Sequence, residues 1–192
     1  MVSEALHEQK ISEIAAKIAN HSKGIKIVLI AGPTSSGKTT FSKRLAIQLL
    51  TRGISPFPLE MDNYFVDRDK TPKDEFGNYN FEAYEALDSA AMERDLMKLL
   101  DGESVQLPKF NFQSGYREPG ATVRLGKNQI VLIEGIHGLN SRLLEEIDKD
   151  KKFRIYASCL TQLNLDHYNR ISTTDTRMLR RIVRDANTRG FS

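Results

Sequence analysis

Apolar positions along the chain follow two patterns that alternate with each other. Short continuous apolar runs, typical of strands buried on both faces of a parallel sheet, occur at residues 25–31, 129–135 and 153–158. In the segments around them, apolar residues recur every three or four positions, the spacing that gives a helix one apolar face. The alternation predicts an α/β fold, in which right-handed crossovers join parallel strands and helices cover the sheet.

Helical spacing is present in five segments. Glutamates and lysines lie opposite the apolar face of the first, Gly53 is expected to cap the second, and Gly102 is expected to end the third. The last helix is expected to start near Ser172, because Ser172-x-x-Asp175 is a capping signature. The predicted helices lie at about residues 3–20, 41–53, 88–100, 141–149 and 172–185.

One further strand is predicted at residues 54–61. Pro56 and Pro58 each remove a donor from a strand ladder, so this strand is expected at the edge of the sheet. The polar segment 67–80, which contains Pro72, predicts a loop.

A small hairpin is predicted by two short extended runs, at residues 105–107 and 121–125. The loop between them carries three aromatic residues, Phe110, Phe112 and Tyr116. Aromatic rings in such a loop suit stacking against a flat ligand ring. The alternative, which the sequence leaves open, is that these rings only cover the hairpin.

The composition fits one domain of 192 residues, which we divide into an N-terminal amphipathic helix (1–24) and a main domain (25–192). A formal net charge of +3 is too small to indicate nucleic acid as a partner. The single cysteine, Cys159, permits no intrachain disulfide and is expected to be buried. The sequence has neither a signal peptide nor an apolar segment of membrane-spanning length, so we expect a cytoplasmic protein without membrane partners; a homo-oligomer stays open.

A complete G-x-x-x-x-G-K-T phosphate loop lies between a predicted strand and a predicted helix. Gly32 and Gly37 let the backbone approach an anion closely, while the Lys38 ammonium can reach the β- and γ-phosphates and the Thr39 hydroxyl can hold Mg²⁺. We expect a site for ATP or GTP with Mg²⁺. Its predicted nucleotide-binding residues are Gly32, Pro33, Thr34, Ser35, Ser36, Gly37, Lys38, Thr39 and Thr40.

Two carboxylates follow or end predicted strands, where ligands gather in open α/β sheets. Asp62 could accept the proton of an attacking hydroxyl or help to hold the metal, with a helix cap or a turn aspartate as the alternative. Glu134 is similar to a Walker B acid, which orients Mg²⁺ directly or through water. His137 is either a ligand contact or a hydrogen-bonded structural residue.

Arginines cluster on the last predicted helix, where Arg177, Arg181 and Arg184 share a face, as do Arg180 and Arg184. Like charges at this spacing cost roughly a few tenths of a kcal/mol per pair, so the cluster needs carboxylate partners or a polyanionic ligand. A solvated face is the alternative. With a phosphate loop in the same chain, arginines that close over a nucleotide fit better.

These motifs together resemble the uridine kinase and phosphoribulokinase family. The resemblance covers residues 25–190, and its motifs are the loop at 32–40, Asp62-Asn63-Tyr64-Phe65, Asn80-Phe81-Glu82, Phe110-Asn111-Phe112, Ile133-Glu134-Gly135 and residues 175–181. It implies a three-layer P-loop kinase fold with a small hairpin and a lid. It also implies phosphorylation of a sugar hydroxyl by a nucleoside triphosphate, usually the 5′-hydroxyl of uridine or cytidine.

The resemblance implies roles for individual residues. Lys38, Asp62 and Arg180 would be catalytic, with Asp62 as the base, and Arg180, Arg184 and Arg189 would belong to a lid that closes on the phosphates. The metal would be held by Thr39, Glu134 and Asp62. The substrate-binding residues would be Asp62, Tyr64, Glu82, Phe110, Phe112, Tyr116, His137 and Arg177.

Three departures limit the resemblance. Glu82 stands where the family typically has an aspartate, and Gly115 stands where it has a pyrimidine-reading histidine, for which His137 or Tyr116 could substitute. The family also continues beyond the arginine helix, so we expect a truncated chain whose last strand lies past Ser192. The sequence therefore predicts a kinase of a nucleoside-like acceptor; the alternatives are a kinase of another sugar or a pantothenate-like alcohol, and a nucleotide-binding regulatory module.

Overall fold

The computed structural model describes residues 2–21, 24–158, 166–169 and 172–188, without the side chains of residues 184, 185, 187 and 188. The predictions for Cys159 and Arg189, and for the side chain of Arg184, fall outside this description.

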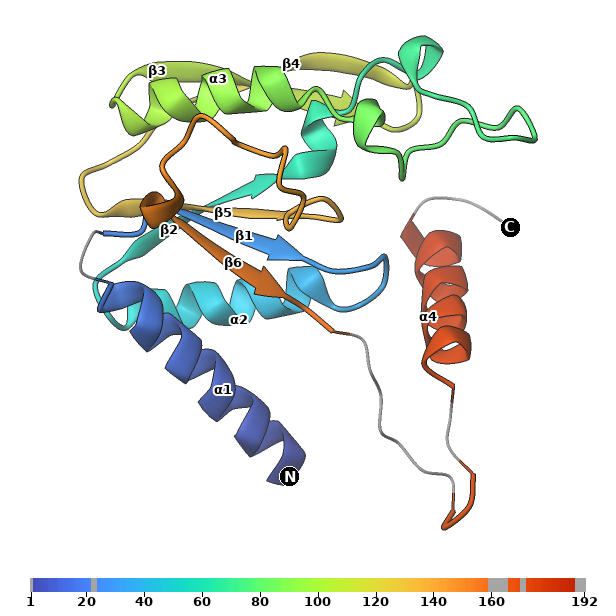
Figure 1. Cartoon of the computed structure of the whole chain (residues 1–192), viewed down its shortest axis with the longest axis horizontal. Helices are drawn as coiled ribbons and strands as arrows, with labels where there is room; N and C mark the ends of the chain where they lie inside the picture. The colour runs from blue at the N-terminus through green and yellow to red at the C-terminus, as the bar shows by residue number, and fades with distance from the viewer. Residues whose placement is uncertain (1, 22–23, 159–165, 170–171, 189–192) are drawn as a thin grey trace.

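A parallel sheet forms the centre of the described structure (Figure 1). Its strands lie in the order β2 (Ser55–Glu60), β5 (Gln129–Gly135), β1 (Ile27–Ala31) and β6 (Lys152–Tyr156), and every neighbouring pair is parallel. The predicted α/β class is confirmed. β2 lies at an edge, as its two prolines predicted.

Helices cover both faces of this sheet. Side chains alternate along β1, so Ile27 and Leu29 pack on one face while Val28 and Ile30 pack on the other. The first face is covered by α3 (Ser89–Leu100), and the second by α2 (Lys38–Leu50) with α1 (Val2–Ala19) outside it. The two cores meet at β1, which is buried along its whole length, and at β5, which is buried over Ile130–Ile133; these strands therefore hold the strand ends in place.

The helix predicted at residues 141–149 is wrong. Residues 141–146 form turns, followed by the short 3₁₀ helix η4 (Lys149–Lys151). Leu144 has a φ of 57°, which is incompatible with a right-handed helix, and its carbonyl accepts from the Lys152 ammonium. The Glu146 N–H donates to the Glu93 side chain at 2.8 Å. Tertiary partners thus take the backbone groups that a helix would have paired internally.

The hairpin is longer than predicted. Strands β3 (Ser104–Asn111) and β4 (Tyr116–Arg124) pair antiparallel across a four-residue turn, with a register shift between Gln106 and Pro108. Pro108 and Pro119 lie opposite each other in this ladder, where neither could donate a hydrogen bond. Because prolines are uncommon inside strands, the sequence predicted only part of each strand.

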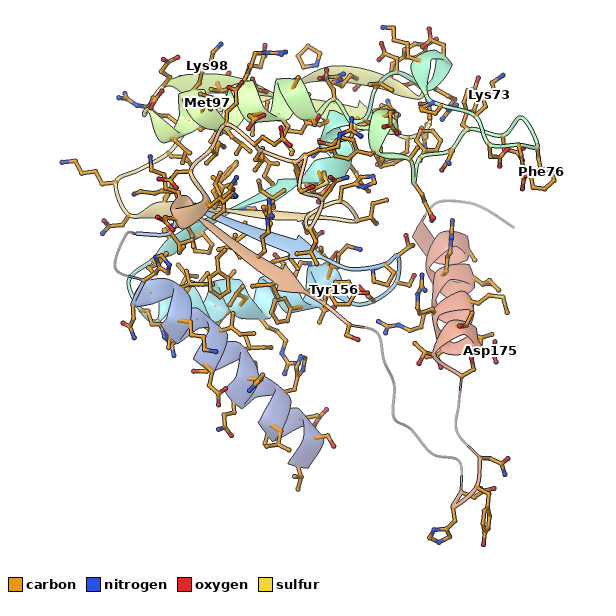
Figure 2. All side chains as sticks on the ribbon, viewed as in Figure 1. Lys73, Phe76, Met97, Lys98, Tyr156 and Asp175 are labelled. Carbon is orange, nitrogen blue, oxygen red and sulfur yellow. The ribbon has the colours of Figure 1, made fainter. Side chains whose placement is uncertain are left out.

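The segment 67–80 is a loop, as predicted, with local order. It contains η2 (Arg68–Lys70) and a turn in which the Asp74 side chain accepts from the backbone of Phe76 and Asn78. Figure 2 shows Phe76 at the projecting tip of this loop.

The remaining helix, α4 (Thr173–Thr188), lies beyond the loop that follows β1 (Figure 1). Its apolar stripe faces solvent, because its members are each more than half exposed: Met178, Leu179, Ile182 and Val183. Within the described residues, none of the helices combines the length and apolarity that a membrane-spanning segment requires.

Helix α1 offers a test of this packing. Ile11 is completely buried against α2, so Ile11→Ala should destabilise the protein by about 2–4 kcal/mol, or roughly 5–15 °C in Tm for a chain of this size. Leu6→Ala is the matched control, since Leu6 lies on the same helix and is 60% exposed. Thermal unfolding followed by circular dichroism measures both, and equal shifts would show that α1 does not share the core.

Candidate functional site

The phosphate loop connects β1 to α2 through a tight approach to β6. A Cβ on Gly32 would lie 2.6 Å from the carbonyl oxygen of Ala157, so only glycine fits there. Gly37, which caps α2, has a φ of 96°, in the left-handed region that glycine favours. The loop therefore delivers the positive end of the α2 dipole and its free N–H groups to the carboxyl edge of the sheet.

Lys38 adds a full positive charge to this place. Its ammonium donates to the carbonyl oxygens of Gly32 at 2.9 Å and Pro33 at 3.2 Å, so it lies folded over the loop. The cation and the N-terminus of α2 thus act on the same small volume. An anion such as a phosphate is favoured there.

Thr39 and Glu134, which are 95 positions apart in sequence, meet at this edge. The Thr39 hydroxyl donates to Glu134 Oε1 at 2.9 Å, while Glu134 Oε2 is buried with no hydrogen-bond partner among the described residues. Burial raises the pKa of Glu134, and the nearby carboxylates of Glu60 and Asp62 raise it further. The hydrogen bond from Thr39 and the charge of Lys38 lower this pKa, but by less. The unsatisfied oxygen is therefore placed to accept a cation or a donor.

The donor set fits Mg²⁺ better than a metal caged by protein. The described residues contain no cluster of three or more side chains of the types that cage a metal ion. Mg²⁺ in phosphoryl-transfer sites is held by one or two protein oxygens, completed by water and phosphate oxygens. Thr39 Oγ1 and the Glu134 carboxylate could supply those oxygens.

A pocket of about 250 Å³ opens beside the phosphate loop. It joins segments that are far apart in sequence, and its lining residues are Pro33, Thr34, Glu82, Ile136, His137 and Arg177. Three predicted substrate-binding residues, Glu82, His137 and Arg177, are thus brought together with two loop residues. A larger hollow of about 320 Å³ lies at the hairpin and includes none of the predicted site residues, so the loop pocket is the better candidate.

Asp62 lies in η1 (Met61–Tyr64), directly after β2, and is partly exposed. Its charge raises the pKa of Glu134 and acts to raise that of His137, so its carboxylate lies within electrostatic range of both. Asp62 thus lies at the carboxyl end of the edge strand but is not among the residues that line the pocket, so its place in the crevice stays a prediction.

His137 is held in place by its surroundings. Burial lowers the pKa of its imidazole. A hydrogen bond with the Ala83 backbone and the charges of Glu85, Asp62 and Glu82 raise this pKa, but by less. The ring lies edge-to-face with Tyr84, 5.4 Å between centroids. Its Nε2 is buried without a hydrogen-bond partner among the described residues, although the residue lines the pocket. His137 therefore combines a structural contact with a nitrogen atom that a ligand could use.

The basic face of α4 lies over the phosphate loop. Arg177 Nε donates to the Thr34 carbonyl at 3.4 Å, and Arg180 Nη2 lies 3.8 Å from the point where a Cβ on Gly37 would be. Arg181 lies 3.6 Å from Glu82 in an exposed ion pair. In Figure 2, where Asp175 marks the first turn of α4, side chains with nitrogen atoms extend from this helix toward the body of the protein.

Two predicted substrate contacts are packing residues in this structure. Tyr64 is 1% exposed, its hydroxyl donates to Asp95 Oδ2 at 3.0 Å, and burial raises its pKa. Phe110 is 3% exposed, in a cluster with Phe65, Phe81 and Ala86. Both residues fill the space under the hairpin, so neither offers an open face to a ligand.

The predicted slot of three aromatic rings is not formed. Tyr116 pairs with Asn111 and Arg117 with Phe110, so Tyr116 lies on the face of the hairpin opposite to Phe110. Phe112, in the turn, is 47% exposed and lies edge-to-face with Phe110. The prediction is wrong because Phe110 and Tyr116 lie in strands, whose pleat sends alternate side chains to opposite faces.

The sequence did not predict the contacts of two arginines near the site: Arg181, which pairs with Glu82, and Arg68, which lies against the turn of the hairpin. Arg181, which pairs with Glu82, was recognised only as part of an arginine face, and Arg68 carried no signal of its own. The one hint for Arg68 was the glycine at position 115, whose significance depends on what fills the space beside it.

The effect of the buried Glu134 carboxylate on stability can be measured. A raised pKa means that folding disfavours the ionised carboxylate, so at neutral pH its charge destabilises the protein. Glu134→Gln should therefore raise Tm in metal-free buffer above that of the wild type. Differential scanning calorimetry with EDTA measures this, with the exposed Glu103→Gln as control; a lower Tm for Glu134→Gln would contradict the assignment.

Comparison with known proteins agrees with this geometry. The model of the phosphoribulokinase / uridine kinase family matches residues 27–192. The chain is 30% identical to uridine-cytidine kinase B of Dictyostelium discoideum over 90% of its own length, and 27% identical to a uridine kinase of Halobacterium salinarum over 84%.

The chain spans 63% of the length of each of these two relatives. A solved structure described as a possible uridine kinase from Bacillus stearothermophilus superposes with a TM-score of 0.62 and 26% identity, over 77% of this chain and 79% of that one. The family match extends over most of the chain, and the fold and the phosphate loop agree with it. The chain belongs to the phosphoribulokinase / uridine kinase family.

Proposed function

We propose that this protein transfers the γ-phosphoryl group of ATP to a hydroxyl of a nucleoside, with the 5′-hydroxyl of uridine or cytidine as the first candidate. The observation that carries the proposal is the shared pocket, in which the phosphate loop and the acceptor candidates Glu82, His137 and Arg177 lie together. Relatives named as uridine kinases support the same acceptor class.

In this proposal, Thr39 and Glu134 would hold Mg²⁺, which would supply positive charge against the phosphate oxygens of ATP. The buried, unsatisfied Oε2 of Glu134 supports this role. Lys38, Arg177 and Arg180 supply further positive charge around the loop, where the transferred group gathers negative charge.

Asp62 is the proposed base. The acceptor oxygen attacks the γ-phosphorus, the bond from that phosphorus to the β–γ bridging oxygen breaks, and the hydroxyl proton passes to the Asp62 carboxylate. ADP leaves with the bridging oxygen. Glu82 accepts hydrogen bonds from sugar hydroxyls, which holds the acceptor in line with the phosphate.

The direct test is ADP release by the full-length protein with ATP, Mg²⁺ and single acceptors. Turnover that depends on a nucleoside supports the proposal. Turnover only with another sugar or a pantothenate-like alcohol moves the activity to that acceptor. ATP binding with no acceptor-dependent turnover would identify a nucleotide-binding regulatory module instead.

Lys38→Ala should lower phosphoryl transfer by about 10²-fold or more, because it removes one preorganised contact to the transition state. Lys43→Ala is the matched control, since Lys43 lies on the same helix with an exposed side chain. Steady-state turnover and Tm are compared for both variants. Activity of Lys38→Ala near that of the wild type, at an unchanged Tm, would remove Lys38 from the mechanism.

Asp62→Asn keeps the shape of the side chain and removes its ability to take a proton. We expect kcat to fall roughly 10²–10⁴-fold while the nucleotide Kd changes far less. The exposed Asp69→Asn serves as control. If the variant instead lost Mg²⁺-dependent nucleotide binding and kept kcat, Asp62 would be a metal ligand and another group would be the base.

A further inference from the structure

The turn at residues 112–115 joins β3 to β4 and ends with a glycine. The space that a side chain at this position would fill is occupied by the side chain of another residue. Gly115 has a φ of 81°, in the region that favours glycine. A Cβ at this position would lie 2.6 Å from Arg68 Nε and 2.7 Å from Arg68 Cζ. The guanidinium of Arg68 therefore fills the space into which a side chain at position 115 would project.

Two hydrogen bonds fix Arg68 against this turn. Its backbone N–H donates to the Gly115 carbonyl at 2.8 Å, and its Nη2 donates to the Phe112 carbonyl at 2.7 Å. The side chain is partly buried, and no carboxylate of the described residues lies within ion-pair distance of it. A guanidinium carries five N–H donors, so most of them remain for a hydrogen-bond acceptor.

The turn is tied to the candidate site by its aromatic neighbours. The exposed ring of Phe112 lies edge-to-face with Phe110, 5.2 Å between centroids, and Phe110 lies 6.5 Å from Phe81. Phe81 directly precedes Glu82, which lines the pocket. The Phe110 N–H also donates to the Asn63 side chain at 3.2 Å, next to Asp62. Phe112, on which Arg68 is held, is thus connected by packing to the segments that carry Glu82 and Asp62.

We propose that Arg68 is a specificity-determining residue, which donates hydrogen bonds to a carbonyl oxygen on the acceptor's ring while the face of Phe112 packs against that ring. The proposal rests on the proposed nucleoside kinase activity and names the property of the base that is recognised. Arg68 acts here from outside the hairpin, in the place that Gly115 leaves open.

The chemistry of the guanidinium predicts which rings are favoured. It is a donor only, so it matches an edge that offers acceptors. Uracil, cytosine and guanine each carry a ring carbonyl oxygen, whereas adenine carries none and places an amino donor beside its ring nitrogen. Arg68 should therefore favour the three carbonyl-bearing nucleosides over adenosine, without a narrow preference for uridine.

The test compares kcat/KM for uridine, cytidine, guanosine and adenosine between the wild type and Arg68→Met, which keeps an unbranched side chain and removes the donors. We expect a loss of about 10-fold or more for each carbonyl-bearing nucleoside that the wild type phosphorylates, and a change within about 3-fold for adenosine. Arg68→Lys, which retains a cation and a donor, should recover part of the loss.

Arg124→Met is the matched control. Arg124 lies on the same hairpin and also donates to a backbone carbonyl, from its Nε to Gly102 at 2.7 Å, but at the end away from the turn. This variant should leave all four values unchanged. The Tm of every variant is measured alongside, because Arg68 also clamps the turn.

Each result has one meaning. Equal losses of kcat/KM for all nucleosides in Arg68→Met, with or without a lower Tm, would reduce Arg68 to a structural clamp and overturn the inference. If Arg68→Met unfolds, Arg68→Lys decides, because an unchanged ratio of uridine to adenosine would overturn the inference as well. If the wild type phosphorylates no nucleoside at all, the proposed function itself fails, and that outcome needs no variant to be recognised.

Discussion

The parallel pairing of β1 with β5 in a single register is the constraint on which the candidate site depends. Ala31 lies opposite Gly135, so the two strands end together at one edge of the sheet. The phosphate loop starts there, and the Glu134 side chain points to the face that carries α2. A slip of one residue would send Glu134 to the opposite face and separate it from Thr39. The buried apolar side chains on both faces of β1 and β5 prevent that slip.

This arrangement concentrates opposing charges in a small space. The charges of Glu60 and Asp62 raise the cost of ionising Glu134, while the Lys38 ammonium donates to two backbone carbonyls of the phosphate loop. These charges lower the stability of the folded protein, but they favour the binding of a polyphosphate together with its cation. Sites of this kind commonly oppose the stability of the fold that carries them.

Among the described residues, helix α4 approaches the site through long polar contacts. The bond from Arg177 to Thr34 is 3.4 Å and the ion pair of Arg181 with Glu82 is 3.6 Å, with both side chains of the pair more than half exposed. Contacts of this type contribute little free energy, so α4 is attached much more weakly than the helices that cover the sheet. The lid that the family resemblance implies stays a prediction.

The sequence by itself determined the parts of this protein that rest on local patterns. Continuous apolar runs predicted the buried strands, the prolines predicted that β2 lies at the edge, and the loop motif with its flanking elements predicted the phosphate site. These features depend on the backbone preferences and burial of neighbouring residues, which a sequence displays directly.

Only the tertiary structure decided how distant segments use their side chains. Leu144 and its neighbours leave the helix that their spacing predicted because other segments take their backbone groups. Phe110 turns into a core that includes Phe65 and Phe81, and Arg68 occupies the space beside Gly115. The physical reason is that packing and long-range hydrogen bonds join residues that are separated in the chain, so no local pattern records which of them will meet.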